Sequence, residues 1–400
     1  MSRNGGKSLL AALFIMAISF SWDDFPEQFD NSLDSVKIQP AVKSIQNHIF
    51  IQGDNYPVLY HLQKEFSGKI DFIYIDPPYN TGNKFIYNDD FATNSDKHSK
   101  WLSFMNRRLQ LAKNLLAESG CIFIAIGQEE LFYLKILCDT IFGEENFVND
   151  FMWLVGKGKK DKWSRTLEQH TLCYAKNKKN LKSFSEFEKT DWAKTNPDND
   201  SRGPWFSGSI SFTEERSNKK HKNYFEITSP SGIKWQRQWL VSKDEMQNLL
   251  AENKIYFGSA PEYDKVPRVK IFNEEETEII PKNIIDFVPS TRQAEKFVDK
   301  MIGQKKSFDN PKPVELIEHL ICITNIKKDV LILDFFAGSG TTFEAVINLN
   351  KKDGGNRKCI LVQKEENDIH QLCKQRINAV LQKNDLTQTE KITFHELKTN

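Results

Sequence analysis

The sequence lacks the cysteine and histidine patterns that hold metal ions or disulfide scaffolds. Its 400 residues include six cysteines, none in a Cys-x-x-Cys pair, and its eight histidines form no cluster with zinc-ligand spacing. Several cysteines lie in apolar runs, where a free buried thiol is the ordinary outcome. The pattern excludes a small secreted disulfide scaffold, and we expect no metal site.

The chain also lacks an excess of charge of either sign. It has 55 Lys and Arg against 54 Asp and Glu, so its net charge is +1. This balance excludes a protein that coats nucleic acid with a uniformly basic surface, although a single basic face is compatible with it. With 39% hydrophobic and 12% aromatic residues, the chain can form a substantial core, and its length suggests two or three domains.

No hydrophobic run reaches the length of a membrane-spanning helix, which needs about 20 residues. The apolar run Leu9–Ile18 follows Arg3 and Lys7. A short apolar stretch behind positive charges is typical of a signal peptide. The alternatives are a helix that packs on the body or on a second subunit, and a start site placed too far upstream. We expect no membrane partner.

Apolar runs alternate with helical patterns in two separate parts of the chain, residues 46–152 and the part after about residue 305. The predicted strands are Ile70–Ile75, Cys121–Ile126, Val330–Phe335 and Lys358–Gln363. A helix is predicted over Asn106–Glu118, ended by Ser119 and Gly120. Strands that alternate with helices predict crossover units, and so an α/β fold with a parallel sheet.

The stretch between these two parts has a different composition. Turn-forming residues accumulate, and six of the eight tryptophans fall between Trp153 and Trp239. Residues 151–240 carry 18 Lys and Arg against 10 Asp and Glu, a local net charge of +8. We therefore predict an N-terminal extension at 1–45 and one α/β domain in two halves, 46–152 and 296–400, split by a basic insertion at 153–295.

The first motif with chemical meaning is Asp76-Pro77-Pro78-Tyr79, directly after the strand Ile70–Ile75. Open α/β sheets bind ligands at the carboxyl ends of their strands. Two successive prolines fix φ and remove two N–H donors, so the turn presents a carboxylate, a bare carbonyl and an aromatic face in one geometry. These groups suit an exocyclic amine on a flat heterocycle. The alternative is an ordinary turn in which Asp76 caps a helix.

The second motif is a glycine-rich turn, Ala337-Gly338-Ser339-Gly340, between the strand that ends near Asp334 and a helix that begins at Thr341. Backbone N–H groups and the positive end of a helix favour an anionic group. The turn lacks the third glycine of a dinucleotide site and the lysine of a P-loop. A carboxylate-bearing, nucleoside-like cofactor such as S-adenosylmethionine (AdoMet) fits it better, although such turns also occur for structural reasons alone.

Two weaker signals accompany these motifs. Gly53-Asp54-Asn55 follows a short predicted strand, and by itself it indicates only a turn. Gln363 to Glu366 ends the strand after the glycine-rich turn, where a polar side chain often meets a ribose hydroxyl. The alternative for this second segment is an acidic first turn of a helix.

Together the motifs resemble a known family. The order of DPPY, a long insertion and FxGxG resembles the permuted β class of DNA amino-methyltransferases, above all the modification (Mod) subunits of type III restriction-modification systems. Matching phrases occur along most of 48–380: IQGDNYPVL, IYIDPPYNTGNKFIYNDDF, WLSFMNRRLQLAKNLL, YAKNKK, RGPW, VPRVK, FDNPKPVELI, LDFFAGSGTT and ILVQKEE. The resemblance implies a Rossmann-like, circularly permuted AdoMet-dependent methyltransferase sheet, with the insertion as a target-recognition domain.

The resemblance implies roles for the DPPY residues toward the substrate. Asp76 and the Pro77 carbonyl would hold N6 of the target adenine, Pro78 would complete the rigid turn, and Tyr79 would stack on the flipped base. Other positions would bind AdoMet. Phe336, Gly338, Gly340 and Thr341 would line its pocket, with Asp334 near its amino-acid end, Asp54 at its adenine, Gln363 or Glu365 at its ribose, and Phe308 and Lys312 near its methionine part.

The implied function is methyl transfer from AdoMet to N6 of adenine in double-stranded DNA, in the cytoplasm, as the modification component of a restriction-modification system. A homodimer and a restriction (Res) subunit are partners that the resemblance leaves open. N4 of cytosine is the alternative target, although such enzymes more often have Ser at position 76. The sequence is also compatible with an RNA substrate or a catalytically inactive DNA-binding subunit. Composition alone permits a two-domain dehydrogenase, but DPPY has no place in such an enzyme.

The sequence departs from the family pattern in three features, of which the hydrophobic N-terminus is one. Gly127-Gln128 stands where the family more often has two acidic residues after the strand. The chain is also shorter than typical type III Mod subunits.

Overall fold

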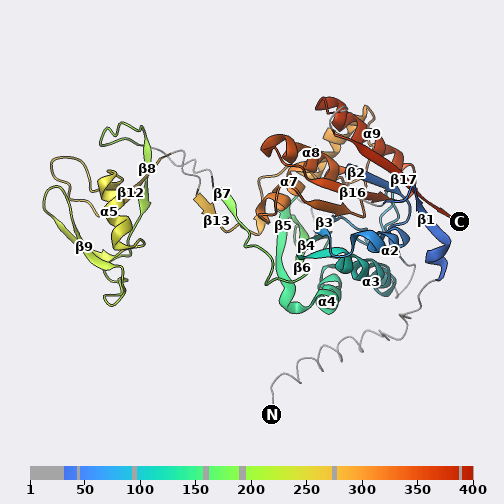
Figure 1. The fold of residues 1–400 in the computed structure, drawn as a ribbon, viewed down its shortest axis with the longest axis horizontal. Coiled ribbons are helices and arrows are strands. Elements are labelled where there is room, and N and C mark those ends of the chain that lie inside the picture. The colour runs from blue at the N-terminus through green and yellow to red at the C-terminus, as the bar shows by residue number, and fades with distance from the viewer. Residues whose placement is uncertain are drawn as a thin grey trace, which may run out of the picture. The chain divides into compact units, whose positions relative to one another are not determined.

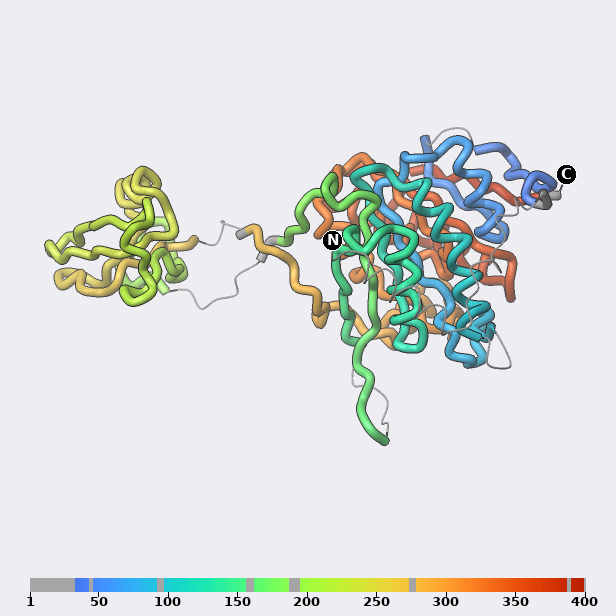
Figure 2. The backbone as a smooth tube through the Cα atoms, turned by 90° about the horizontal axis from the view of Figure 1, so that it is seen from below, coloured from blue at the N-terminus to red at the C-terminus, as the bar shows by residue number. Residues whose placement is uncertain are grey.

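The computed structural model describes residues 31–42, 46–91, 97–155, 162–188, 195–272, 277–386 and 390–399. The chain forms two compact units, of which the first comprises Met1–Phe184 and Pro281–Asn400 and the second comprises Ser185–Ile280 (Figures 1 and 2). Most of the predicted N-terminal extension, including the apolar run Leu9–Ile18, lies outside the described residues.

A ten-stranded sheet forms the centre of the first unit, in the order β1-β17-β2-β16-β15-β3-β4-β6-β5-β14. In that order the strands are Val36–Gln39, Ile392–Thr399, His48–Gln52, Lys358–Gln363, Leu331–Asp334, Ile70–Ile75, Leu116–Ile126, Glu168–Ala175, Phe147–Leu154 and Ile284–Ile285. The strands from β17 to β4 are parallel, whereas β6 is antiparallel to both of its neighbours. The half of the chain with β3 and β4 precedes the half with β15 and β16, so the predicted permuted α/β sheet is confirmed.

Helices cover both faces of this sheet (Figure 1). One face packs against α2 (Asn55–Phe66), α3 (Lys97–Leu115) and α4 (Leu131–Phe142). The other face packs against α7 (Val314–Ile323), α8 (Thr341–Asp353) and α9 (Ile369–Lys383), and α6 (Thr291–Ile302) contacts α9. Short 3-10 helices at Asn31–Ser35 and Glu144–Asn146 complete the unit.

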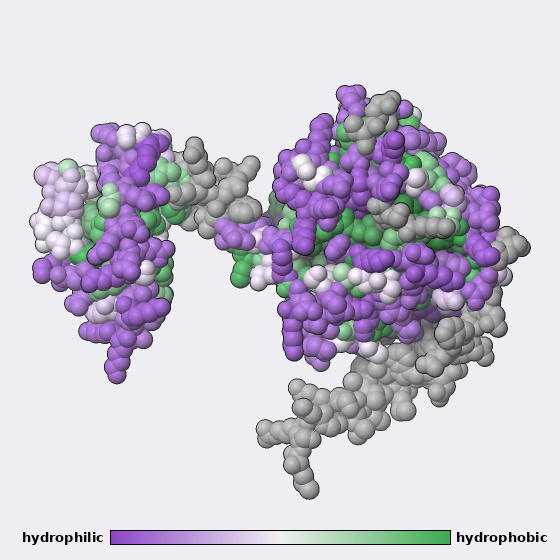
Figure 3. All heavy atoms as spheres, in the orientation of Figure 1, coloured by the Kyte–Doolittle hydropathy of each residue, from purple (hydrophilic) through white to green (hydrophobic). Residues whose placement is uncertain are grey.

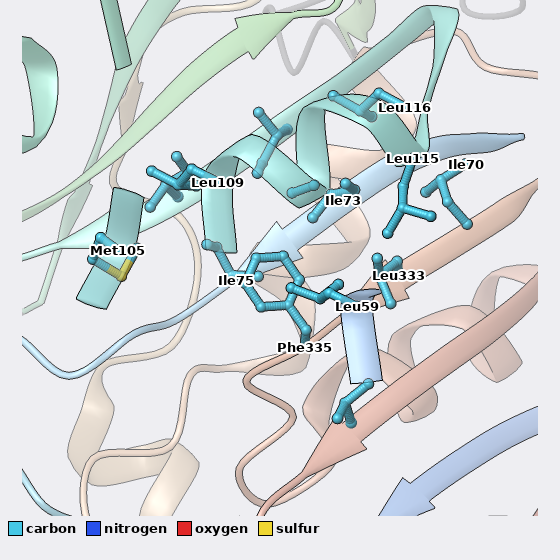
Figure 4. Packing of buried hydrophobic residues seen from close by; sticks show 14 of the residues in the cluster. Leu59, Ile70, Ile73, Ile75, Met105, Leu109, Leu115, Leu116, Leu333 and Phe335 are labelled. Carbon is cyan, nitrogen blue, oxygen red and sulfur yellow. The ribbon is translucent and has the colours of Figure 1, made fainter. Parts of the chain in front are cut away.

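The central strands are buried on both faces, which explains their nearly continuous apolar sequence. In β3, Ile73 and Ile75 belong to the cluster under α2 and α3, while Phe72 and Tyr74 belong to the cluster under the other helices. Figure 4 shows the first cluster, in which Leu333 of β15 lies near Ile73 and Ile75. Side chains that alternate between faces with period two therefore join both helical layers to one sheet.

The boundary between α3 and β4 differs from the sequence prediction. The predicted helix Asn106–Glu118 is wrong at its end, because α3 stops at Leu115 and β4 begins at Leu116. Gly120 does not end a helix but lies within this strand, so close to β3 that a Cβ atom would lie 2.8 Å from the carbonyl oxygen of Ile70. The glycine thus permits a close approach of two backbones, which helical periodicity does not reveal.

The second unit is built from short strands and one helix. Its strands are β7 (Glu186–Glu188), β8 (Trp205–Ser209), β9 (Tyr224–Thr228), β10 (Lys234–Gln238), β11 (Ile255–Tyr256), β12 (Arg268–Phe272) and β13 (Thr277–Ile279). They form an antiparallel sheet β11-β12-β8 and the pairs β9–β10 and β7–β13. The helix α5 (Lys243–Ala251) has a capping box from Ser242 and Glu245, and its Met246 joins a core with Ile227 and Trp239.

The second unit spans fewer residues than the insertion predicted at 153–295. The strands β5 and β6 pair with each other and with the main sheet, and β14 pairs with β5, so residues before Ser185 and after Ile280 belong to the first unit. Loss of helical periodicity marks the start of antiparallel strands at this edge of the sheet, not the start of a new domain. The role of the second unit in target recognition stays a prediction.

Hydrophilic residues dominate the face of each unit that Figure 3 shows. Among the described residues, no helix is long and apolar enough to cross a membrane.

Candidate active site

A cavity of about 1310 Å³ opens at the carboxyl ends of the central strands. Asp76 follows β3, Asp334 ends β15, Gln363 ends β16 and Asp54 follows β2, and these four strands are parallel neighbours in the sheet. Parallel pairing therefore brings the separate motifs to one edge. The cavity exceeds the roughly 300–1,000 Å³ that is typical of small-molecule sites.

The DPPY turn presents one carboxylate and one bare carbonyl to this cavity. The Nζ atom of Lys312 lies 2.7 Å from both carboxylate oxygens of Asp76, and the Lys312 side chain is only 6% exposed. The Pro78 carbonyl accepts a 2.7 Å hydrogen bond from the indole Nε1 of the buried Trp101. Among the described residues, no group donates to the Pro77 carbonyl. The turn is thus fixed through Asp76 and Pro78, while the Pro77 carbonyl can accept a hydrogen bond from a ligand.

Tyr79 lines the same cavity and is held from two sides. Its hydroxyl donates to Gln169 Oε1 at 3.4 Å. A Cβ atom on Gly127 would lie 2.9 Å from Cδ2 of Tyr79, so the glycine at this position lets the strand end pack against the aromatic ring. Burial and the nearby Asp76 carboxylate raise the pKa of Tyr79 well above its ordinary value. The residue is therefore a neutral aromatic surface over a wide pH range.

The segment after the DPPY turn is tied down by a network of buried polar groups. Asn80 adopts a left-handed φ of 59°, and its side chain donates to Glu130 Oε1 at 2.6 Å. The Asp89 carboxylate accepts from the backbone N–H groups of Asn80 and Thr81 at 3.0 and 2.9 Å. His98 also contacts Glu130. Burial raises the pKa of this glutamate. This network fixes the direction in which the chain leaves Tyr79.

The segment 81–91 then reaches the glycine-rich half of the unit. The backbone N–H of Ile86 donates to Asp309 at 2.9 Å, and that of Asn88 donates to Glu366 at 2.8 Å. Asn367 returns a 2.6 Å bond to the Ile86 carbonyl. Contacts from both halves of the sheet thus enclose one side of the cavity.

The glycine-rich turn has the backbone geometry that its sequence requires. Gly338 and Gly340 have φ values of +52° and +85°, which side chains rarely adopt. A Cβ atom on Gly338 would lie 3.1 Å from Cζ of Phe308, and one on Gly340 would lie 3.0 Å from Sγ of Cys373. The N–H of Gly338 donates to Gln363 Oε1 at 2.8 Å, so this glutamine supports the turn.

Asp334 lies beneath this turn as a buried support. Its carboxylate accepts from the N–H of Phe336 at 3.0 Å and from the hydroxyl of Thr342 at 2.5 Å. The pKa of Asp334 is raised to about 7, mainly by burial and also by the charge of Asp76, while the two hydrogen bonds oppose this shift. The protonation of Asp334 therefore changes near neutral pH.

A buried ion pair holds the turn against α9. Arg376 donates to Glu344 at 2.9 Å, to the Ser339 hydroxyl at 2.7 Å and to the Thr341 hydroxyl at 2.9 Å. Arg376 and Glu344 are only 1% and 2% exposed. Sequence reasoning missed both residues, because Arg376 lies in a helical pattern with no motif of its own.

A second arginine fixes the other end of the cavity. Asp54 caps α2 by accepting from the N–H of Tyr56 at 2.9 Å, and it pairs with Arg108 at 3.0 Å. Arg108 also donates to the Asn55 side chain at 2.5 Å. Burial lowers the pKa of Arg108 to about 10, and Asp54 opposes this shift.

The structure brings most of the predicted site residues together. Asp54, Asp76, Pro77, Pro78, Tyr79, Phe308, Lys312, Asp334, Phe336, Gly338, Thr341 and Gln363 all line the cavity. Gly340 and Glu365 do not line it. Glu365 instead accepts from Gln52 at 3.3 Å at an exposed position, and Glu366 lines the cavity. Lys312, predicted near the cofactor, contacts the Asp76 carboxylate.

Phe104, Arg108 and Tyr87 are lining residues that the sequence motifs did not identify. Among the described residues, no group of three or more His, Cys, Asp or Glu could hold a metal ion.

Comparison with known proteins agrees with this arrangement. The family model described as DNA methylase matches residues 70–374, which is most of the chain and includes both motifs. The chain therefore belongs to the DNA methylase family.

Three relatives show the extent of the similarity. The type III restriction-modification enzyme StyLTI Mod subunit from Salmonella typhimurium is 34% identical, covering 79% of this chain and 52% of the relative. The EcoPI Mod subunit from Escherichia phage P1 is 32% identical over 87% of this chain and 64% of its own length. The type II methyltransferase M.KpnI from Klebsiella pneumoniae is 33% identical over 84% of both chains. The chain thus spans about half to two thirds of the length of these two Mod subunits.

Replacing Arg376 by Met should destabilise the first unit by about 3–5 kcal/mol, because Glu344 would stay buried without its partner. Replacing both residues by Met should restore most of the lost free energy of unfolding. Urea denaturation of the single and double variants measures both effects. If the double variant lost as much free energy of unfolding as the two single variants together, the two residues would not be coupled.

The stability of the protein should depend on the ionisation of Asp334. Because its pKa is raised to about 7, the folded state binds a proton that the unfolded chain has lost above pH of about 4. The contribution of Asp334 to stability is therefore greatest at low pH and decreases as pH rises through 7. Relative to Asp334→Asn, the wild-type free energy of unfolding should fall by a few kcal/mol between pH 4 and pH 8. Urea denaturation at both pH values tests this, with the exposed Asp286→Asn as the matched control; equal differences at both pH values would refute it.

Proposed function

We propose that the protein is an AdoMet-dependent, site-specific DNA methyltransferase that methylates N6 of adenine as the modification component of a restriction-modification system. The observation that carries this proposal is the cavity in which the Asp76 carboxylate, the Pro77 carbonyl and the Tyr79 ring lie together with the glycine-rich turn. Membership of the DNA methylase family and the names of the Mod relatives support it.

The residues of the glycine-rich half fit AdoMet. Gly338 lets the ring of Phe308 pack close to the turn, and Phe308 and Phe336 both line the cavity as aromatic surface. The N-terminal end of α8 favours the carboxylate of an amino acid, while Asp54 and Asp334 suit its cationic and donor groups. When bound, AdoMet supplies a methyl group activated on a sulfonium centre.

The DPPY turn would then hold the amine that acts as the nucleophile. Asp76 and the Pro77 carbonyl accept one hydrogen bond each from the two hydrogens of the target amine, which fixes the direction of the nitrogen lone pair. As the nitrogen gains the methyl group it becomes positively charged, and the carboxylate stabilises this charge before the extra proton leaves. Alignment of the amine supplies most of the acceleration. The base must leave the duplex to reach the cavity, and Tyr79 offers the stacking surface that holds it.

The second unit is the candidate for reading the DNA sequence. Between β8 and β9 it carries Lys219, Lys220, His221 and Lys222, all exposed. Exposed lysines neutralise phosphates, and a separate module can follow the grooves while the catalytic unit holds the flipped base. DNA, a homodimer partner and a Res subunit complete the proposed set of partners, and the cytoplasm is the proposed location.

The direct test is the transfer of labelled methyl from AdoMet to unmethylated genomic DNA, followed by digestion and identification of the product nucleoside. N6-methyladenine is the expected product, and mapping the modified sites then gives the recognition sequence. Formation of N4-methylcytosine would show that the target base is cytosine, while the proposed chemistry at the amine would be unchanged. AdoMet binding without transfer to any DNA would favour an inactive DNA-binding subunit.

Replacing Asp76 by Ala should lower the rate of methyl transfer at least 100-fold, because the amine loses both its alignment and its charge stabilisation. AdoMet affinity, measured by calorimetry, should change little. The exposed Asp286→Ala is the matched control and should retain the wild-type rate. A normal rate for the Asp76 variant would overturn the assignment.

Replacing Lys219, Lys220 and Lys222 together by Ala should weaken DNA binding and reduce its salt dependence. Each lost phosphate contact lowers the slope of log affinity against log salt by about 0.9. Fluorescence anisotropy at several salt concentrations measures this slope. A triple variant at the exposed Lys327, Lys351 and Lys352 of the first unit serves as the control, and an equal effect there would argue against a specific role for the second unit.

A further inference from the structure

Lys312 is placed at the substrate end of the cavity, and its position is built into the fold. It lies between Pro311 and Pro313, whose fixed φ angles leave the segment little freedom. All three residues are buried, and Pro313 is the N-cap of α7. The Nζ atom of Lys312 lies 2.7 Å from both oxygens of Asp76.

The ammonium group of Lys312 has one more donor than these contacts use. A lysine carries three N–H donors, and two of them reach Asp76. Among the described residues, no other group accepts a hydrogen bond from it. A buried charged donor without an acceptor is costly, so the site favours a ligand that supplies one.

The position of Nζ relative to Tyr79 shows where that ligand atom would lie. Nζ is 5.0 Å from the centroid of the Tyr79 ring. A base stacked on this ring would lie roughly 3.5–4.0 Å above it, the usual separation of carbon atoms in contact. Nζ thus lies over the ring and 2.7 Å from the carboxylate that would hold the amine, so a base with its amine at Asp76 would bring the neighbouring ring nitrogen to the ammonium group.

We propose that Lys312 donates a hydrogen bond to the ring nitrogen next to the target amine, so that Asp76 and Lys312 read adjacent groups on the base. This assignment rests on the proposed methyltransferase function. In adenine the amine at C6 is flanked by the acceptors N1 and N7, and in cytosine the amine is flanked by N3. Guanine and thymine have a carbonyl oxygen at the equivalent position, which would face the Asp76 carboxylate and be repelled.

This role is distinct from two simpler ones. If Lys312 only orients Asp76, its loss would slow methylation of every base analogue by the same factor. If Lys312 binds the carboxylate of AdoMet, its loss would weaken AdoMet binding. Only a contact with the base makes the effect of Lys312 depend on the ring nitrogen.

The test compares wild type with Lys312→Met on duplexes that carry adenine, 1-deazaadenine or 7-deazaadenine at the mapped target position. In the wild type, kcat/KM for one of the two analogues should be about 10- to 100-fold lower than kcat/KM for the other. This is the loss expected when a hydrogen bond to a charged group is removed. In Lys312→Met the same analogue should be methylated at nearly the same rate as adenine. Calorimetry should show unchanged AdoMet affinity. Lys351→Met, an exposed lysine at the end of α8, is the matched control and should keep the wild-type discrimination.

Several results would overturn the assignment. Equal kcat/KM for all three bases in the wild type would do so, even if Lys312→Met fails to fold. A discrimination factor that is unchanged in Lys312→Met would reduce Lys312 to a positioning role, and a large loss of AdoMet affinity would place it at the cofactor. If the product is N4-methylcytosine, 3-deazacytosine replaces the adenine analogues. Absence of transfer to any base by the wild type would refute the proposed function itself, and this assignment with it.

Discussion

The parallel pairing of β3 with β15 is the interaction on which the rest of the structure depends. Phe72 pairs with Ile332 and Ile73 with Leu333, joining segments that lie far apart along the chain. The pairing places Asp76 and Asp334 at the same edge of the sheet, one at the end of each strand. The cavity and its polar contacts all follow from this register, because a shift by one residue would turn every buried side chain to the opposite face.

Once the two halves are joined, ion pairs that each contain a buried cation stabilise the site. Lys312 with Asp76, Arg376 with Glu344, and Arg108 with Asp54 each connect a motif to a helix or loop from elsewhere in the chain. Such pairs contribute little net stability when compared with apolar packing, whereas removal of one partner leaves an uncompensated charge and is costly.

The sequence was sufficient to predict the central parallel strands and the two motifs at strand ends, because these depend on local patterns. It did not reveal that β6, β5 and β14 extend the same sheet, because these strands were assigned to the insertion. Asp76 and Gly338 stand beside turns whose residue types are distinctive. The partners of these residues were harder to predict. Arg376 occupies an ordinary helical position, and its contact with Ser339 exists only because α9 packs against the glycine-rich turn. Choosing between Glu365 and Glu366 likewise required the direction in which the chain leaves β16, which periodicity does not supply.

The way in which the second unit is attached bears on how easily this module could be replaced. The chain leaves the first unit after Phe184, whose ring stacks on Phe151 of β5, and it returns through β14, which pairs with Met152 and Trp153 of the same strand. Both attachment points are therefore anchored to one short stretch of β5. A module joined through two neighbouring points can be exchanged for another without any change in the sheet or the cavity. If the second unit reads the target, as proposed, exchange of this module alone would change the specificity and leave the chemistry of the cavity unchanged.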